Sequence, residues 1–245
     1  MLKYGFAFLF FNAAFLLFSQ GYSRTIELTN HRMYGSDILK LQRKLVEYGF
    51  TEIGEIDGYY GPLTANVISK IQFFLGFEPN GKVEKKLWDS LFSEPNKELL
   101  EKIQLVSGYD QNVLRKISES RMGYSTEGGY IDTYFDGNTA RKTDLFLFGE
   151  MGKAEYCLYY FDSDAFFIIE KKYYYHMPET DEEMEGYTSL YQYLFSEENL
   201  RKTIMESTIY YKDQNGLFQI NEGNLEETSF DLNWLMRMVE HNNDA

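Results

Sequence analysis

The stretch 35–92 constrains the fold of this chain more than any other part of it. Apolar residues recur at helical spacing on both sides of an Asp57-Gly58 pair, which predicts two amphipathic helices joined by a tight loop. Gly49 is placed to end the first helix, and Pro62 suits the first position of the second. This pattern predicts a small helical domain over 35–93.

The apolar positions of this stretch form one stripe on each expected helix, including a short third helix after the Pro-Asn-Gly turn. The stripes are Ile38, Leu41, Leu45 and Val46 in the first helix, Leu63, Val67, Ile68, Ile71, Phe74 and Leu75 in the second, and Val83, Leu87, Trp88 and Leu91 in the third. One apolar side on each of three short helices predicts a three-helix bundle with a single core.

The polar and small residues of the stretch resemble the peptidoglycan-binding domain found beside cell-wall hydrolases. The matching positions are Gly35, Leu41-Gln42, Gly49, Asp57-Gly58, Gly61-Pro62, Thr64, Gln72, Gly76, Gly81 and Trp88. Val67, Ile71 and Leu87 depart from the family pattern, where Ala, Phe and Thr are usual. The resemblance covers roughly a quarter of the chain. It implies a three-helix fold and a bacterial peptidoglycan ligand.

The resemblance also implies a binding site at the loop before the second helix. The candidate residues are Asp57, Gly58, Tyr59, Tyr60, Gly61 and Thr64. The Asp57 carboxylate would accept hydrogen bonds from the amides of the stem peptide. The glycines would let the ligand approach the backbone closely, and the tyrosines would offer flat aromatic faces with a polar hydroxyl. The threonine lies near a helix N-terminus, which favours a ligand carboxylate. The same residues also have a purely structural interpretation, as a tight turn followed by a helix cap.

Two glutamines, Gln42 and Gln72, stand close to the apolar stripes. We interpret both as structural amides that satisfy backbone groups, because buried amides in proteins are nearly always hydrogen-bonded.

Residues 1–23 have the features of a secretory signal peptide. Lys3 gives a positive start, and the apolar run 6–18 is too short to span a bilayer comfortably. Small residues precede Arg24, which is the expected mature start; an uncleaved anchor is the alternative. The only cysteine, Cys157, does not lie at the expected cleavage site, so lipid attachment at that site is excluded. We expect a secreted or periplasmic, cell-wall-associated protein with no stable membrane anchor after cleavage.

The formal net charge of −14 makes nucleic acids and anionic membranes unsuitable partners.

A short lead-in arm is expected over 24–34. A linker and helical segment is expected over 94–129. Its pattern predicts first a helix, which gives way to a strand near Leu105. Helical spacing resumes at 113–117, and a loop is expected over 118–129.

Residues 130–245 are predicted to form a second domain, because short aromatic runs typical of strands alternate with tight turns. Strands are expected at 130–135, 143–148, 155–161 and 165–175, with a further hairpin over 208–220, a partly helical stretch over 186–205 and a closing helix over 230–239. The predicted fold class is therefore α+β multidomain, a small three-helix bundle followed by an antiparallel β-meander domain with a C-terminal helix.

Catalytic motifs are absent from the sequence of this second domain. The three histidines are too scattered for a zinc peptidase, and no serine-hydrolase motif occurs. Cys157 and His176 fall in predicted strands and could meet, but burial would raise the pKa of the thiol. No cofactor or metal is expected. Tyr173 and Tyr175 share one face of a strand, suited to sugar or protein contact unless the 186–205 insertion shields it.

We therefore expect a secreted envelope protein that binds peptidoglycan non-catalytically through its N-terminal domain. The β-rich domain would present an interaction surface, with an envelope protein as a candidate partner. Two alternatives stay open at this point: a cell-wall hydrolase with an unrecognised catalytic C-terminal domain, and a protein-interaction scaffold that has lost glycan binding.

Overall fold

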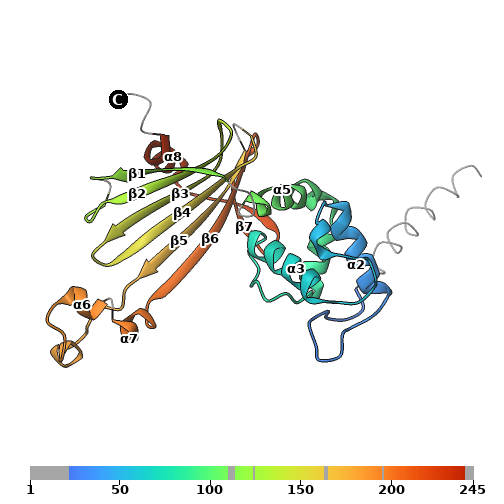
Figure 1. The fold of residues 1–245 in the computed structure, drawn as a ribbon, viewed down its shortest axis with the longest axis horizontal. Coiled ribbons are helices and arrows are strands. Elements are labelled where there is room, and N and C mark those ends of the chain that lie inside the picture. Colours follow the sequence, from blue (N-terminus) through green and yellow to red (C-terminus); the bar gives the residue numbers. More distant parts are fainter. Residues whose placement is uncertain (1–21, 110–113, 124, 163–164, 195, 241–245) are drawn as a thin grey trace, which may run out of the picture. The chain divides into compact units, whose positions relative to one another are not determined.

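The structure is a computed structural model that describes residues 22–109, 114–123, 125–162, 165–194 and 196–240 (Figure 1). Residue contacts divide the chain into two units, Met1–Gln104 and Leu105–Ala245, and each is described here by itself. All but the last two residues of the predicted signal peptide, 1–23, lie outside the described residues. Over the described ranges, no helix is long and apolar enough to cross a membrane.

The first unit is a bundle of short helices. Its elements are α2 (Ser36–Glu47), the 3-10 turn η1 (Thr51–Ile53), α3 (Pro62–Phe74), α4 (Lys85–Leu91), the 3-10 turn η2 (Glu94–Asn96) and α5 (Lys97–Ser107), which crosses the boundary between the units. The three predicted helices are confirmed as α2, α3 and α4. Gly49 follows α2 in the left-handed region at φ 95°, and Pro62 is the first residue of α3, as expected.

Most of the predicted apolar stripes are buried, including the three positions that depart from the family pattern. Leu63 is an exception, since it is 57 % exposed. It lies in the first turn of α3 beside Gly54, so its assignment to the buried stripe is wrong. Val83 is buried but not helical: it pairs with Ile26 in an antiparallel bridge, and α4 begins only at Lys85.

The second unit is built on one eight-stranded sheet in which every strand pairs with its neighbours in sequence, all antiparallel. The strands are β1 (Arg115–Arg121), β2 (Gly129–Asp136), β3 (Thr139–Gly149), β4 (Gly152–Tyr160), β5 (Phe166–Tyr174), β6 (Ile204–Asp213), β7 (Gly216–Asn221) and β8 (Asn224–Glu227). The predicted meander is confirmed, with the predicted strands found as β2 to β7.

The two edge strands were not expected. β1 begins at Arg115, within the helix predicted at 113–117, of which residue 113 lies outside the described residues. It also takes up part of the loop predicted over 118–129, and the residues near Leu105 stay in α5 rather than forming a strand. β1 and β8 are largely exposed and carry mostly polar and charged residues. Such edges lack an alternating apolar pattern because they are not buried, and their charges discourage pairing with another chain.

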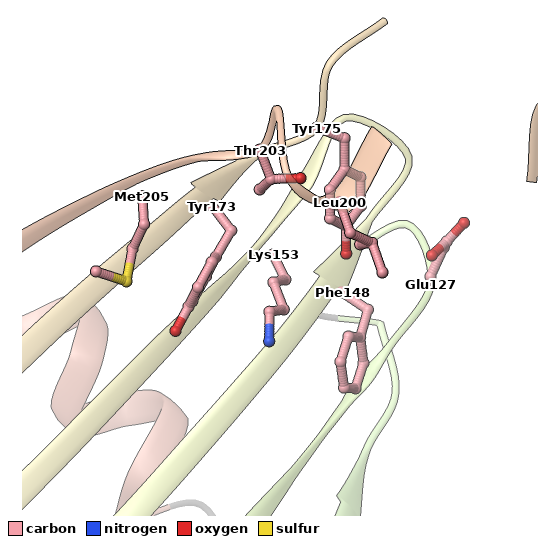
Figure 2. A pocket seen from close by; sticks show the side chains of 8 residues that line it. All are labelled: Glu127, Phe148, Lys153, Tyr173, Tyr175, Leu200, Thr203 and Met205. Atoms are coloured by element: carbon pink, nitrogen blue, oxygen red, sulfur yellow. The ribbon is translucent and has the colours of Figure 1, made fainter. Parts of the chain in front are cut away.

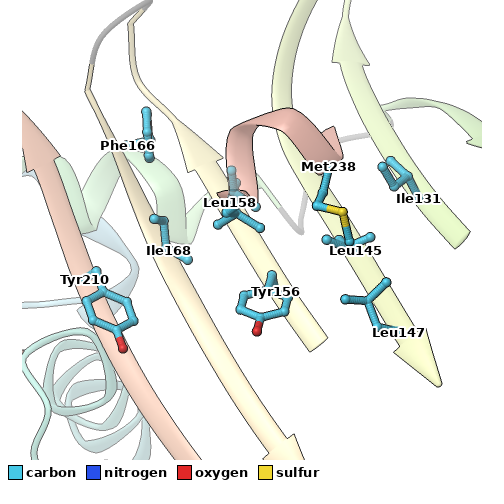
Figure 3. Packing of buried hydrophobic residues seen from close by; sticks show 10 residues of the cluster. Ile131, Leu145, Leu147, Tyr156, Leu158, Phe166, Ile168, Tyr210 and Met238 are labelled. Atoms are coloured by element: carbon cyan, nitrogen blue, oxygen red, sulfur yellow. The ribbon is translucent and has the colours of Figure 1, made fainter. Parts of the chain in front are cut away.

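The helix α8 (Leu232–Glu240) covers one face of the sheet, in agreement with the predicted closing helix. Figure 3 shows Met238 of this helix next to Ile131 and Leu145 of the sheet. The buried cluster of this face comprises Ile131, Leu145, Leu147, Tyr156, Leu158, Phe166, Ile168, Tyr210, Leu235 and Met238. Burying a continuous apolar cluster of this kind is the main stabilising contribution to such a unit.

The segment between β5 and β6 holds only short helical pieces: η4 (Asp181–Met184), α6 (Leu190–Leu194) and α7 (Glu197–Leu200). Asn199 ties the segment together, because its side-chain amide donates to the carbonyl of His176 at 3.0 Å and to that of Leu194 at 3.3 Å. The expected partly helical stretch is therefore present, anchored where the chain leaves β5.

Candidate functional site

The side chain of Gln42 makes several hydrogen bonds to the loop between α2 and α3. Its Oε1 accepts from the backbone N–H of Gly58 at 2.8 Å, and its Nε2 donates to Asp57 Oδ1 at 3.1 Å and to the Tyr59 carbonyl at 3.2 Å. Asp57 Oδ1 also accepts from the Tyr59 N–H at 2.9 Å. Gln42 is 1 % exposed, which confirms its interpretation as a structural amide.

The same arrangement recurs at the loop that precedes α4. Gln72 Oε1 accepts from the Gly81 N–H at 2.7 Å, while Nε2 donates to Asn80 Oδ1 at 3.0 Å and to the Lys82 carbonyl at 2.9 Å. Gly58 and Gly81 have φ of +77° and +69°, the left-handed region that favours glycine. The unit is therefore built on two Gly-containing loops, each held by a buried glutamine.

Asp57 presents a charged carboxylate at the protein surface. The backbone N–H of Tyr59 and, next, the amide of Gln42 lower the pKa of Asp57 below its ordinary value. Both donors favour the ionised form, so the group is an anion throughout the neutral range.

An exposed pair of tyrosines lies beside this carboxylate. The rings of Tyr34 and Tyr59 are 4.6 Å apart at their centroids, and the two residues form an antiparallel backbone bridge. They are 57 % and 45 % exposed. Gly58 passes close to the pair: a Cβ there would lie 3.1 Å from the Tyr34 ring and 2.9 Å from Leu39 Cγ. The loop thus offers two aromatic faces next to one negative charge.

Three of the six candidate residues, Gly58, Tyr60 and Thr64, lie in the interior. Tyr60 is 0 % exposed, and its hydroxyl donates to the carbonyl of Gly81 at 2.5 Å, which links the two glycine loops. Burial raises the pKa of Tyr60 far above its ordinary value. Thr64 is 2 % exposed. The expectation that the Tyr60 ring offers a flat face to a ligand does not fit this burial, because the ring lies inside the unit.

Gly61 is the N-cap of α3 and supplies no side chain to its first turn. The backbone N–H groups at a helix start have no partner within the helix, and the helix dipole makes that end positive. The loop therefore places a carboxylate, the exposed Tyr59 ring and an uncapped helix N-terminus within a few residues of sequence, and the backbone bridge adds the Tyr34 ring from a distant segment.

The sheet unit does not bring the other sequence candidates together. Cys157 lies in β4 opposite Ile169, whereas His176 lies beyond the end of β5 and faces Glu183 at 4.0 Å. Burial, reinforced by the nearby Asp144, raises the pKa of the Cys157 thiol to about 12. A partly buried, protonated thiol without a histidine is a poor nucleophile.

Metal-binding side chains are likewise not assembled. Within the part of the chain that the structure describes, no three His, Cys, Asp or Glu side chains are grouped so that they could hold a metal ion.

Comparison with protein families assigns the helical unit. Residues 34–91 match the family described as "Putative peptidoglycan binding domain", which confirms the resemblance predicted from the sequence. The match begins at Tyr34, one residue before the predicted start, and so includes the exposed ring that sequence spacing had missed. The sheet unit is not assigned. No curated protein and no solved structure matches the chain.

Proposed function

We propose that this protein attaches to bacterial peptidoglycan through residues 34–91 and binds the wall without cleaving it. The observation that carries the proposal is the exposed Tyr34–Tyr59 pair beside the Asp57 carboxylate, within the segment that matches a peptidoglycan-binding family.

The chemistry of peptidoglycan suits this surface. Its stem peptides offer amide N–H groups, carboxylates and alanine methyl groups. The Asp57 carboxylate can accept from the amides, the tyrosine rings can cover the methyl groups, and the N-terminus of α3 can receive a carboxylate. Gly61 adds no side chain that would keep the ligand away from the backbone, and a Cβ at this position would meet nothing within 4 Å.

The six predicted residues divide into two roles in this proposal. Asp57, Tyr59 and Gly61 face the ligand together with the added Tyr34, whereas Gly58 is buried and shapes the loop. Tyr60 and Thr64 lie in the interior, where the Tyr60 hydroxyl ties the loop to the second glycine loop.

The proposal also covers where the protein is located and what the sheet unit does. The signal-peptide pattern of residues 1–23 supports export, so the mature chain would begin at Arg24 and remain with the wall. Arg24 already belongs to the folded unit, because its guanidinium donates to Asp37 at 2.9 Å and to the Tyr34 carbonyl at 2.8 Å. The sheet unit would serve as a non-catalytic interaction domain, with an envelope protein as a candidate partner.

Sedimentation with purified insoluble peptidoglycan tests this function. The chain from Arg24 onward is mixed with the wall and centrifuged, and the pellet is compared with that of the double variant Tyr34→Ala, Tyr59→Ala. We expect retention of the native chain and a loss of at least about tenfold in affinity for the variant, since exposed aromatic anchors carry much of the binding energy at such surfaces.

The supernatant is assayed for released muropeptides in the same experiment. Release would contradict the non-catalytic claim and favour a hydrolase. Failure of the native chain to sediment would contradict wall binding and favour a scaffold that keeps the fold without the ligand.

A further inference from the structure

The face of the sheet opposite α8 holds a cavity of about 450 Å³, within the usual size range of small-molecule sites. Its lining residues are Glu127, Phe148, Lys153, Tyr173, Tyr175, Leu200, Thr203 and Met205. Side chains alternate along each strand, so Phe148 and its neighbour Leu147, which packs under α8, point to opposite faces. The cavity is therefore separate from the core of the unit.

Four strands contribute to the floor of this cavity in one row. The register places Phe148 of β3 opposite Lys153 of β4, Lys153 opposite Tyr173 of β5, and Tyr173 opposite Met205 of β6. Figure 2 shows Lys153 lying between Phe148 and Tyr173. A row fixed by backbone pairing across four strands is rigid, which suits a preformed binding site.

The positive charge of the cavity, that of Lys153, is already paired. Glu155 accepts from the Lys153 ammonium at 2.7 Å and from the Tyr173 hydroxyl at 3.1 Å, and the ammonium lies 4.3 Å from the centre of the Tyr173 ring. Because a carboxylate neutralises this cation and Glu127 adds a second negative charge, the cavity is unsuited to an anionic ligand. The paired groups keep hydrogen-bonding capacity without a net positive charge.

The insertion between β5 and β6 supplies one wall. Leu200 and Thr203 line the cavity at the end of α7 and just after it, and the position of α7 is fixed by the hydrogen bonds of Asn199. Thr203 Oγ1 is buried and has no hydrogen-bond partner among the described residues. An unpaired buried hydroxyl is unfavourable, so a ligand that reaches it with a polar group gains a hydrogen bond that the protein alone does not make.

Aromatic surface continues beyond the cavity on the same face. Tyr130 of β2 stacks on Phe146 with ring centroids 4.4 Å apart and lies 6.0 Å from Phe148. Tyr130 is 36 % exposed. An elongated ligand could thus occupy the cavity with one group and cover the Tyr130 ring with the next.

We propose that this cavity binds a neutral saccharide. A pyranose ring has apolar C–H faces that pack on aromatic rings and hydroxyl edges that both donate and accept hydrogen bonds. The cavity offers aromatic faces from Phe148, Tyr173 and Tyr175, and hydroxyl, ammonium and carboxylate groups at its edges. This proposal goes beyond wall attachment through residues 34–91 and stands on different residues, so either can fail alone.

Isothermal titration calorimetry on the chain from Arg24 onward tests the proposal. The probes are the β-1,4-linked tetrasaccharide of N-acetylglucosamine, cellotetraose and, as an apolar anionic ligand, decanoate. We expect at least one tetrasaccharide to bind with a dissociation constant of about 1 mM or tighter. Decanoate should give no response.

Variants locate the binding. Tyr173→Ala should weaken tetrasaccharide binding by at least about tenfold, because it removes a ring and a hydroxyl from the floor of the cavity. Thr203→Val, which keeps the shape and removes the hydroxyl, should weaken it by several-fold. The matched control is Tyr174→Ala, since Tyr174 points to the opposite face, where its hydroxyl donates to Glu206. This control should bind as the native chain does.

Three results would overturn the proposal: no response to either tetrasaccharide, a response to decanoate alone, or equal weakening by Tyr173→Ala and Tyr174→Ala in variants that keep the native circular dichroism. The double variant of Tyr34 and Tyr59 should leave tetrasaccharide binding unchanged, which separates this test from that of wall attachment.

Discussion

Asp57 and Asn80 occupy equivalent places in the two glycine loops of the helical unit. Each Oδ1 accepts from the backbone N–H two residues later, at 2.9 Å in both loops, and from a buried glutamine amide, at 3.1 Å and 3.0 Å. A neutral amide therefore suffices to build this loop. Because the geometry does not need a charge, the carboxylate of Asp57 is free to serve recognition instead.

This equivalence predicts different outcomes for two substitutions of Asp57. Asp57→Asn should keep the loop and the unfolding free energy, because the amide oxygen can replace Oδ1 as it does at Asn80. Asp57→Ala should lower the unfolding free energy by about 1 kcal/mol through the loss of two accepted hydrogen bonds. Urea unfolding measures both, and peptidoglycan sedimentation should weaken in both.

If Asp57→Asn sediments with peptidoglycan as well as the native chain, the charge takes no part in recognition. Equal destabilisation by both substitutions would contradict the equivalence of the two loops.

Gln42 should be far more important for stability than its neighbour on the surface. Gln42→Ala leaves the buried N–H of Gly58 without its acceptor and should cost about 2 kcal/mol. The control is Arg43→Ala, an exposed position on the same helix, which should change the unfolding free energy by less than about 0.5 kcal/mol. Comparable effects in urea unfolding would show that the hydrogen bonds to the loop contribute little.

Gly58 and Gly61 provide a second matched pair. Gly58→Ala forces a side chain to φ +77° and places its Cβ 2.9 Å from Leu39 Cγ, so we expect a loss of about 2 kcal/mol. Gly61 has φ −110°, and a Cβ at this position would meet nothing within 4 Å, so Gly61→Ala should be nearly neutral in stability. Thermal unfolding of the two variants measures the difference, and a neutral Gly58→Ala would contradict the loop geometry.

The partly buried thiol of Cys157 gives a prediction about pH. Since the fold raises the pKa of Cys157 to about 12, the folded chain keeps the proton while the unfolded chain loses it near pH ~8.5. The group's contribution to the unfolding free energy is therefore complete below about pH 8.5 and is lost progressively as the pH rises above that value.

At pH ~8 we expect the thiol of the folded chain to react with Ellman's reagent at least about 100-fold more slowly than in urea. Rapid labelling of the folded chain would show an accessible, ionised cysteine instead. The variant Cys157→Ala, which should not react under either condition, is the control.

The sequence was informative wherever a feature has a period or a fixed spacing. The helices α2, α3 and α4 follow from apolar residues three and four apart, and the strands β2 to β7 from aromatic runs between turns. The loop residues Asp57 and Gly58 were found because their spacing to Gln42 and Pro62 matches a family pattern. These are local properties that a single sequence displays directly.

Features decided by tertiary contacts were not predicted. The edge strand β1 is polar because nothing covers it, so it shows no apolar alternation. Tyr59 and Tyr60 are adjacent and chemically alike, yet one is exposed and the other buried, because backbone direction at the bridge to Tyr34 decides which ring turns inward. The contribution of Tyr34 itself depends on that same bridge, which no spacing rule reveals.

The most direct test of wall recognition is a nuclear magnetic resonance titration of the isotope-labelled chain from Arg24 onward with a soluble muropeptide that carries an intact stem peptide. The account predicts saturable shift changes that centre on the amides of residues 57–61 and of the first turn of α3, together with Tyr34. Shift changes confined to the sheet unit, or none at millimolar muropeptide, would contradict the claim that the Asp57 loop binds peptidoglycan.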